Sequence, residues 1–367
     1  MAGAHWTELD RRFMRLACRL ARKAAGRTSP NPIVGAVLVR GGKIVGKGYH
    51  RFAGGDHAEI AALKQAGAKA KGATLYITLE PCSHQGQTPP CVHALIRAGI
   101  KQVIAGTKDP NPLVAGRGFQ QLRRAGIRVR VGLLEAESRR VIEAFTKFIT
   151  KQLPFVTLKL AATLDGRIAT VTGDARWISE GASRKSVHRM RDEADAWLVG
   201  SGTVKADDPR LTCRIAGGRN PWRVVLDSHL RLPLTAKIFR LADREKTIVA
   251  AGVNAPMKKV RAIEALGAQV WRLPVSKGRI AWRPLLRKMA SAGIVSVVIE
   301  GGAAVAASAL KDKVVDKVLF FYAPKIFGGD GRPMIDDLGV RRVRQAIALK
   351  RLEVRRSGVD LLISGYL

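Results

Sequence analysis

The chain has 367 residues, which is too long for one typical domain and enough for two domains with separate hydrophobic cores. Hydrophobic residues make up 47% of it, a proportion that is typical of globular proteins and excludes a disordered chain. It carries 64 Lys and Arg against 29 Asp and Glu, a net charge of +35, which favours anionic partners. Because the cations are spread through both halves, they indicate a solvated basic surface more than a dedicated nucleic-acid site.

The amino terminus gives no sign of export or of membrane anchoring. Residues 1–26 are charged throughout, and no stretch of the chain approaches the roughly 20 apolar residues of a membrane span. We therefore expect a cytoplasmic protein. In that reducing compartment, closely spaced cysteines bind metal or take part in catalysis more often than they form disulfides. Two of the four cysteines lie in the segment EPCSHQGQTPPC at residues 80–91.

Helix and strand patterns alternate along the first 150 residues, which predicts an α/β domain. Apolar residues recur at helical spacing from residue 8, and this pattern stops at Gly26. The turn signal Gly41-Gly42 separates two β-rich runs. We expect helices at 8–26, 57–67, 91–99, 118–126 and 135–150, and strands at 33–39, 43–49, 74–79, 102–106 and 127–134.

A second α/β series follows Leu153-Pro154, which we take as the seam between two domains. In this series Asp165-Gly166 predicts a turn, and the small and charged residues at 200–214 predict a loop. Residues 297–310 predict a strand, a Gly-Gly turn and an Ala-rich helix, an arrangement that can bind an anion at the helix N-terminus. Other strand patterns lie at 155–166, 196–204, 223–227, 247–251 and 317–329, with a helix near 183–193. The expected fold class is α/β, with domains at 1–150 and 151–367.

The residues around the paired cysteines have the composition of a zinc site. His57, Cys82 and Cys91 offer one imidazole and two thiolates, and catalytic zinc takes three protein ligands and a water. Zinc converts such a water to hydroxide near neutral pH, and Glu59 is the candidate for carrying protons between it and a substrate. Because positions i and i+2 do not face each other within a helix, His57 has to lie at a helix start. The order H-x-E, P-C and a second Cys is typical of zinc deaminases.

A closed structural zinc site is one alternative, and a pair of buried thiols is another. A closed site needs a fourth ligand, for which His50, His84 and His93 are candidates. Glu59 favours the catalytic interpretation, because a structural site does not need this acid. The spacing also departs from the common P-C-x-x-C pattern, since eight residues separate Cys82 from Cys91.

Three segments together, TSPNPIVGAVLV, HAE and EPCSHQGQTPPC, resemble the deaminase half of the bifunctional riboflavin-biosynthesis deaminase–reductases. The resemblance implies a cytidine-deaminase-like fold. It also implies hydrolytic removal of the 2-amino group of 2,5-diamino-6-(5-phosphoribosylamino)pyrimidin-4-one. Substrate contacts are implied for Asn31, His50 and His84.

One position departs from this family pattern. Many members have Lys or Arg just before TPPC, where the side chain can meet the substrate phosphate, but this chain has Gln87. We therefore expect phosphate binding at this point to be weaker or to use another cation, with Arg51 and Lys108 as candidates.

The second half resembles the reductase half of the same family, so the resemblance runs from about residue 8 to the end. It implies a dihydrofolate-reductase-like fold and NADPH-dependent reduction of the ribosyl group of 5-amino-6-(5-phosphoribosylamino)uracil to ribityl. Substrate contacts are implied for Lys159, Ala175, Arg191, Leu211, Arg214 and Glu300. Cofactor contacts are implied for Ala161, Trp177, Thr203, Asp207, Ser228, Gly302, Ala303, Ala304, Val305, Ala306, Ala307 and Ser308.

Three functions are compatible with these patterns. The first is an enzyme of flavin synthesis with one zinc ion per chain and NADPH, acting on phosphorylated pyrimidines without a membrane or nucleic-acid partner. The second is a zinc deaminase of nucleic-acid bases that uses the basic charge to bind the backbone. The third is a zinc-stabilised binding module. The complete second domain argues against the second function, and Glu59 argues against the third. A homo-oligomer is compatible with each.

Overall fold

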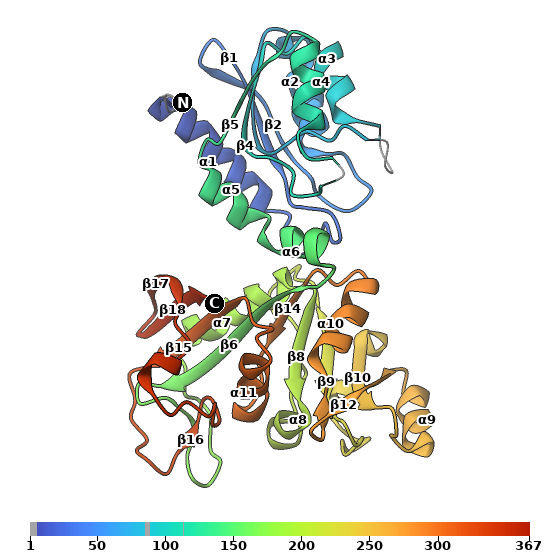
Figure 1. Cartoon of the computed structure of the whole chain (residues 1–367), viewed down its shortest axis with the longest axis vertical. Coiled ribbons are helices and arrows are strands. Elements are labelled where there is room, and N and C mark those ends of the chain that lie inside the picture. Colours follow the sequence, from blue (N-terminus) through green and yellow to red (C-terminus); the bar gives the residue numbers. More distant parts are fainter. Residues whose placement is uncertain (1–5, 85–88, 113) are drawn as a thin grey trace. The chain divides into compact units, whose positions relative to one another are not determined.

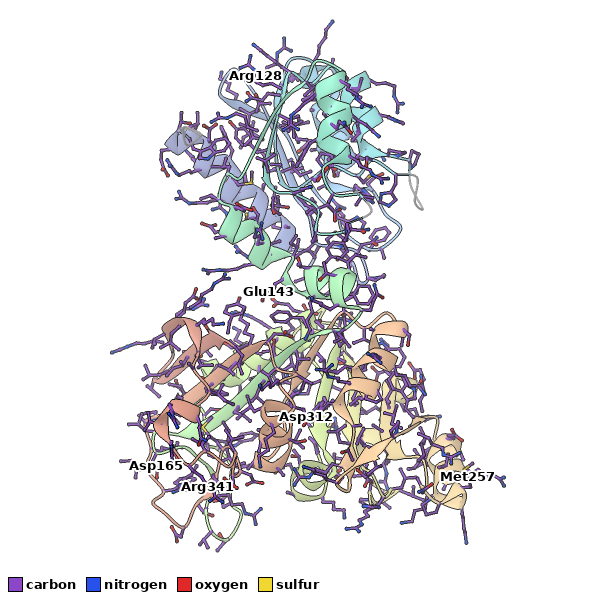
Figure 2. The ribbon with its side chains drawn as sticks, viewed as in Figure 1. Arg128, Glu143, Asp165, Met257, Asp312 and Arg341 are labelled. Atoms are coloured by element: carbon purple, nitrogen blue, oxygen red, sulfur yellow. The ribbon has the colours of Figure 1, made fainter. Side chains whose placement is uncertain are left out.

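The computed structural model describes residues 6–84, 89–112 and 114–367. The chain divides into two compact units, Met1–Gln152 and Leu153–Leu367 (Figure 1). In both units charged side chains project outward from the ribbon, as Arg128 and Arg341 do (Figure 2), and both of these residues are exposed. None of the helices in the described part of the chain is both long and apolar enough to cross a membrane.

A five-stranded sheet forms the centre of the first unit, in the order β2-β1-β3-β4-β5. Strand β1 is antiparallel to β2 and β3, whereas β3, β4 and β5 run parallel. Helices α1 and α5 cover one face, and α2, α3 and α4 cover the other. The strands are β1 (Gly35–Arg40), β2 (Lys43–Tyr49), β3 (Thr74–Leu79), β4 (Gln102–Thr107) and β5 (Arg128–Val131). The helices are α1 (Glu8–Arg22), α2 (Ala58–Ala66), α3 (Cys91–Arg97), α4 (Arg117–Arg124), α5 (Glu135–Val141) and α6 (Glu143–Lys151).

Two glycines of β2 allow α2 to lie directly on the sheet. A β-carbon at Gly46 would come 2.3 Å from the carbonyl oxygen of Ala62, and one at Gly48 would come 2.5 Å from that of Ala58. Real side chains do not tolerate such distances, so the backbones of β2 and α2 approach each other only because these positions lack a side chain. This close packing fixes the start of α2, where His57 lies.

A nine-stranded sheet forms the centre of the second unit, in the order β11-β10-β9-β8-β14-β6-β15-β18-β17. The strands from β11 to β15 in this order run parallel, and β18 and β17 add an antiparallel edge. Helices α10 and α11 pack on one face of the sheet, and α7 and α9 pack on the other. The helices are α7 (Gly181–Glu193), α8 (Ser201–Asp207), α9 (Met257–Ala265), α10 (Trp282–Ser291) and α11 (Ala303–Lys311). The strands are β6 (Phe155–Thr163), β8 (Ala196–Gly200), β9 (Trp222–Leu226), β10 (Thr247–Gly252), β11 (Gln269–Leu273), β14 (Ser296–Ile299), β15 (Lys317–Ala323), β17 (Lys350–Ser357) and β18 (Asp360–Tyr366).

Several expectations about secondary structure were wrong. The strand expected over 196–204 ends at Gly200, and the strand expected over 317–329 ends at Ala323. The single helix expected over 135–150 is two helices, because the buried residue Ile142 has non-helical backbone angles of φ −111° and ψ 19°. The loop expected over 200–214 begins with helix α8, which has Gly200 as its N-cap and buries Val204. The sequence did not indicate this helix, because its Gly and Asp residues have low helix propensity. The expected helix 8–26 ends at Arg22.

Candidate active sites

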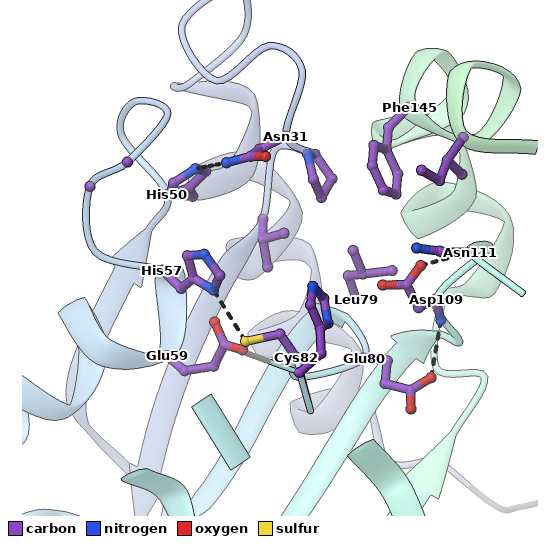
Figure 3. A pocket seen from close by; sticks show the side chains of 16 residues that line it. Asn31, His50, His57, Glu59, Leu79, Glu80, Cys82, Asp109, Asn111 and Phe145 are labelled. Atoms are coloured by element: carbon purple, nitrogen blue, oxygen red, sulfur yellow. Dashed lines mark hydrogen bonds between the residues drawn. The ribbon is translucent and has the colours of Figure 1, made fainter. Parts of the chain in front are cut away.

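Three side chains from separate elements converge in the first unit. Figure 3 shows two of them, His57 and Cys82. His57 is the N-cap of α2 with extended backbone, Cys82 follows the end of β3, and Cys91 is the first residue of α3. The Nδ1 atom of His57 lies 3.5 Å from Sγ of Cys82 and 3.2 Å from Sγ of Cys91. The three ligand atoms all lie within 4.8 Å of one another. This is the arrangement expected for one metal ion with an imidazole and two sulfur ligands.

The chemistry of the donor set also fits zinc. Hydrogen bonding by Cys91, helped by His57 and opposed by burial, lowers the pKa of Cys82 to about 4. Cys82 is therefore a thiolate at neutral pH, the form that binds metal. Within the described residues no fourth His, Cys, Asp or Glu joins the cluster. Three protein ligands with one position left over are typical of catalytic and not of structural zinc.

The three candidates for a fourth ligand lie elsewhere. Both ring nitrogens of His50 are engaged, Nδ1 with the carbonyl oxygen of Asp56 at 3.1 Å and Nε2 with Nδ2 of Asn31 at 3.4 Å. His84 is exposed and lines the adjoining cavity, and His93 is an exposed residue of α3. The alternative of a closed structural zinc site with four protein ligands therefore has no support among the residues that the structure describes.

Glu59 lies in the second position of α2 beside the cluster, as the expected helix start at His57 requires. Its side chain is buried, with 3% of its surface exposed, and lines the same cavity (Figure 3). Burial, followed by the negative charge of Cys82, raises the pKa of Glu59 to about 7, while His57 acts in the opposite direction. A carboxyl group in this range can both accept and donate a proton at neutral pH.

A cavity of about 350 Å³ extends from Glu59, a size suited to a small ligand. Asn31, His50 and His84, the three substrate contacts implied by resemblance, all line it. Neither Arg51 nor Lys108 lines it, and the described part of its lining contains no Lys or Arg. Gln87, where a cation was expected, lies outside the described residues.

Sequence reasoning missed several residues of this cavity, of which Glu80 is the most informative. Its buried carboxylate accepts hydrogen bonds from the backbone N–H groups of Asp109, Gly116, Gly118 and Phe119 at 2.9–3.3 Å. Glu80 therefore fixes the segment that brings Asp109 and Asn111 into the cavity. The position of Glu80, between strand β3 and Pro81-Cys82, was the available signal. The other missed lining residues are Pro32, Val34, Gly54, Gly55, Leu79, Asp109, Asn111, Phe145 and Ile149.

The second unit has its own cavity, of about 580 Å³. All six residues with an implied substrate contact line it, namely Lys159, Ala175, Arg191, Leu211, Arg214 and Glu300. Five of the implied cofactor contacts also line it, namely Ala161, Trp177, Thr203, Asp207 and Gly302. Sequence reasoning missed six titratable lining residues, namely Arg176, Arg184, His188, Asp208, Arg210 and Lys237.

The remaining implied cofactor contacts do not line this cavity. Ser228 follows β9, and its carbonyl oxygen accepts a hydrogen bond from the N–H of Gly252 at 3.0 Å. Residues 303–308 form the first part of α11, where Ala306 and Ala307 are buried. The hydroxyl of Ser308 accepts a hydrogen bond from Nε1 of Trp282 at 2.9 Å, so this side chain faces α10.

A partly buried carboxylate, that of Glu300, organises the cations of the second cavity. Oε1 of Glu300 accepts a hydrogen bond from Nζ of Lys159 at 2.5 Å, and Oε2 accepts from Arg191 Nη2 and Trp197 Nε1, both at 2.7 Å. Burial alone would raise the pKa of Glu300, but the charges of Lys159 and Arg191 and their hydrogen bonds lower it to about 2. Glu300 is therefore ionised at neutral pH and holds both cations in place.

The Gly-Gly turn between β14 and α11 gives a testable packing prediction. A β-carbon at Gly301 would come 2.8 Å from Cβ of Val305, whereas one at Gly302 would meet nothing closer than Thr203 Oγ1 at 3.8 Å. We expect Gly301→Ala to lower the free energy of unfolding of the second unit by about 1–3 kcal/mol, because overpacking displaces the start of α11. Gly302→Ala should leave it nearly unchanged. Urea unfolding followed by tryptophan fluorescence checks the pair, and equal stability of the two variants would contradict the prediction.

Together, the folds and sites define an enzyme of two α/β domains, the first with a candidate catalytic zinc site and the second with a cavity lined by cations around Glu300. Residues 7–107 match the family model of the cytidine and deoxycytidylate deaminase zinc-binding region. Residues 154–363 match the family model of the RibD C-terminal domain. The first match contains His57, Cys82, Cys91 and Glu59, and the second contains Glu300 with its cations.

Individual relatives match over nearly the full length. The riboflavin biosynthesis protein RibD of Aquifex aeolicus is 46% identical, over 97% of this chain and 98% of the relative. A solved structure of RibD from Acinetobacter baumannii has a TM-score of 0.88 and 36% identity, covering 98% of this chain and 99% of the other. A Thermotoga maritima structure, described as a diaminohydroxyphosphoribosylaminopyrimidine deaminase/5-amino-6-(5-phosphoribosylamino)uracil reductase, has a TM-score of 0.86 and 39% identity, with the same coverage. The chain belongs to the RibD family of bifunctional deaminase–reductases of riboflavin biosynthesis.

Proposed function

We propose that the first unit deaminates 2,5-diamino-6-(5-phosphoribosylamino)pyrimidin-4-one and that the second reduces the ribosyl group of the deaminated product to ribityl. The observation that carries this proposal is the presence of two separate cavities, one beside His57, Cys82, Cys91 and Glu59 and the other around Glu300. The reactions named for the Thermotoga maritima relative supply the substrates. We also propose that the protein acts in the cytoplasm on these phosphorylated small molecules without a nucleic-acid partner, and its four free cysteines suit that reducing compartment.

In the first unit, His57, Cys82 and Cys91 would hold zinc. When bound, zinc acts as a Lewis acid that makes water a nucleophile at neutral pH. Glu59 then accepts a proton from the attacking water and passes it to the departing amine. A carbon–oxygen bond forms at the 2-position, the carbon–nitrogen bond breaks, and ammonia leaves. Asn31 and His50, which contact each other at 3.4 Å on the cavity wall, orient the pyrimidine ring.

In the second unit, NADPH would supply the hydride, and the residues of the chain bind and orient both reactants. Glu300 holds Lys159 and Arg191 at fixed positions in the cavity, where their positive charges can face a phosphorylated sugar. Trp177, with 61% of its surface exposed at the cavity wall, offers a flat face for a ring of the cofactor.

Removing a ligand tests the metal site directly. We expect Cys82→Ser to lower the zinc content well below one ion per chain, because serine does not supply a thiolate. The same variant should release no ammonia. Reduction of the already deaminated substrate should continue. Cys213→Ser, which alters a free cysteine outside the cluster, is the matched control and should keep its zinc. Zinc content is measured by elemental analysis, and full zinc occupancy in Cys82→Ser would contradict the ligand assignment.

Supplying each substrate separately tests whether the two units catalyse separate reactions. The protein should reduce 5-amino-6-(5-phosphoribosylamino)uracil with NADPH after zinc has been chelated, since the reductase cavity contains no residue of the zinc cluster. It should release ammonia from the diamino compound when NADPH is left out. If chelation stops both reactions in folded protein, the two cavities do not act separately and the proposal is wrong.

A further inference from the structure

Helix α6 carries apolar side chains that take no part in a hydrophobic core. It begins after the non-helical residue Ile142, and none of its residues is fully buried. Within the described residues, Phe145, Phe148 and Ile149 belong to none of the four core clusters. A surface helix ordinarily places its apolar face on the core. The apolar side chains of α6 therefore have another role.

Two of these side chains line the cavity of the first unit. Phe145 and Ile149 are four residues apart, so they lie on the same side of α6, and both line the cavity beside the zinc cluster. Figure 3 shows the ring of Phe145 directed into the cavity, across from His50 and His57. Phe148, on the same helix, does not line it. In the described part of the lining, Phe145 is the one aromatic residue besides the histidines.

The composition of the cavity indicates what the ring of Phe145 contacts. The polar side chains of Asn31, His50 and Asp109 line the same cavity and can form hydrogen bonds with groups at the edge of a substrate ring. A pyrimidine also has two flat faces, which carry no hydrogen-bonding group. An aromatic side chain stacks on such a face, and replacing it by alanine in complexes with nucleic-acid bases weakens binding about fivefold to 150-fold. The cavity thus offers polar contacts for the edge of a pyrimidine and an aromatic contact for one face.

We propose that Phe145 is a substrate-binding residue of the deaminase site, which packs its ring on the pyrimidine of 2,5-diamino-6-(5-phosphoribosylamino)pyrimidin-4-one, with Ile149 beside it in the apolar wall. This inference rests on the proposed function, because the substrate comes from it. The match to the deaminase zinc-binding region ends at residue 107, and the match to the RibD C-terminal domain begins at residue 154. Helix α6 lies between these two matched regions, so the contact assigns part of the segment that joins them to the deaminase site.

Three substitutions in α6 test this contact through the release of ammonia. We expect Phe145→Ala to raise KM for the diamino substrate about tenfold or more with little change in kcat, because it removes a binding contact and no group that transfers a proton. Phe145→Leu, which keeps an apolar side chain without a flat ring, should have a KM between those of the wild type and Phe145→Ala. Phe148→Ala is the control, since it removes the same kind of ring from the same helix outside the cavity, and should behave as the wild type.

A ligand without the sugar and phosphate identifies the part of the substrate that Phe145 contacts. 5,6-Diaminouracil is the ring of the deaminated product, so it can occupy the cavity but has no 2-amino group to release. We expect it to inhibit ammonia release competitively, with an inhibition constant that Phe145→Ala raises by about the same factor as KM. An unchanged KM in Phe145→Ala, an unchanged inhibition constant, or no inhibition of the wild type would overturn the inference.

Further measurements separate loss of binding from loss of structure. Zinc content, thermal unfolding and reduction of the deaminated substrate should match those of the wild type in each variant. A raised KM that is accompanied by loss of zinc or by partial unfolding would also overturn the inference, because it would give Phe145 a structural role. A wild-type protein that releases no ammonia from the diamino substrate would instead overturn the proposed function.

Discussion

Glu59→Gln is expected to lower the rate of ammonia release by a factor of about 10²–10⁴, the usual contribution of a general acid–base group. Glutamine has nearly the same shape but does not accept a proton from water. Glu59 is buried beside the three ligand atoms, and it is not one of them. The variant should therefore keep one zinc ion per chain. Ammonia release from the diamino substrate is the measurement.

Two readouts make this prediction specific. Reduction of the deaminated substrate should proceed at the wild-type rate, because Glu59 lies in the first unit and does not line the reductase cavity. Zinc content and thermal unfolding should match those of the wild type. Loss of both activities in a folded, zinc-loaded variant would show that the two reactions share a site, and wild-type ammonia release would remove Glu59 from the mechanism.

The second large effect is expected for Glu300→Gln, which should lower the free energy of unfolding of the second unit by about 3–5 kcal/mol. The side chains of Lys159 and Arg191 are only 6% and 11% exposed, so the variant leaves two buried cations without their counter-charge. Reduction should fall by at least tenfold, since both cations line the cavity. All tryptophans except Trp6 lie in Leu153–Leu367, so tryptophan fluorescence reports mainly on this unit during urea unfolding.

The dependence of this effect on pH provides a further check of the same variant. The pKa of Glu300 is lowered from 4.5 to about 2, so its ionised form stabilises the folded state fully above pH 4.5. This contribution is lost as the pH falls from 4.5 towards 2. The stability difference between the wild type and Glu300→Gln should therefore narrow over this range. Glu353→Gln, which breaks a surface ion pair of 3.2 Å with Arg355, is the control and should cost less than about 1 kcal/mol. A difference that does not change with pH would contradict the role assigned to the Glu300 charge.

The zinc cluster was predictable because its signal is local. His57 and Glu59 are two residues apart, and Cys82 and Cys91 end one short segment, so residue types and spacing were enough. Glu80 was not predictable in the same way, although it directly precedes Pro81-Cys82. Its role depends on backbone amides of residues 109–119, which only the folded chain brings to it.

The ion pairs of Glu300 in the reductase cavity show a second limit of prediction from sequence. Lys159 and Glu300 are far apart in sequence, and they meet because β6 pairs with β14 in a register that places Leu158 opposite Ile299. Strand order and register are properties of the whole sheet. Resemblance to the family could therefore indicate Lys159 and Glu300 as site residues, but their spacing in the sequence could not. Strand β17 was missed for a different reason. Its sequence KRLEVRRS has only two apolar residues, Leu352 and Val354, among charged ones, because it forms the exposed edge of the sheet.

Following both products in one reaction is the most direct test that one chain carries out both steps. Purified, zinc-loaded protein is incubated with 2,5-diamino-6-(5-phosphoribosylamino)pyrimidin-4-one and NADPH, while ammonia and the absorbance of reduced nicotinamide are recorded together. We expect ammonia to appear first and NADPH then to be oxidised in an equal amount, with the ribityl compound as the final product. No ammonia from metal-loaded protein, or salt-sensitive RNA binding accompanied by deamination of RNA bases, would contradict the proposed function.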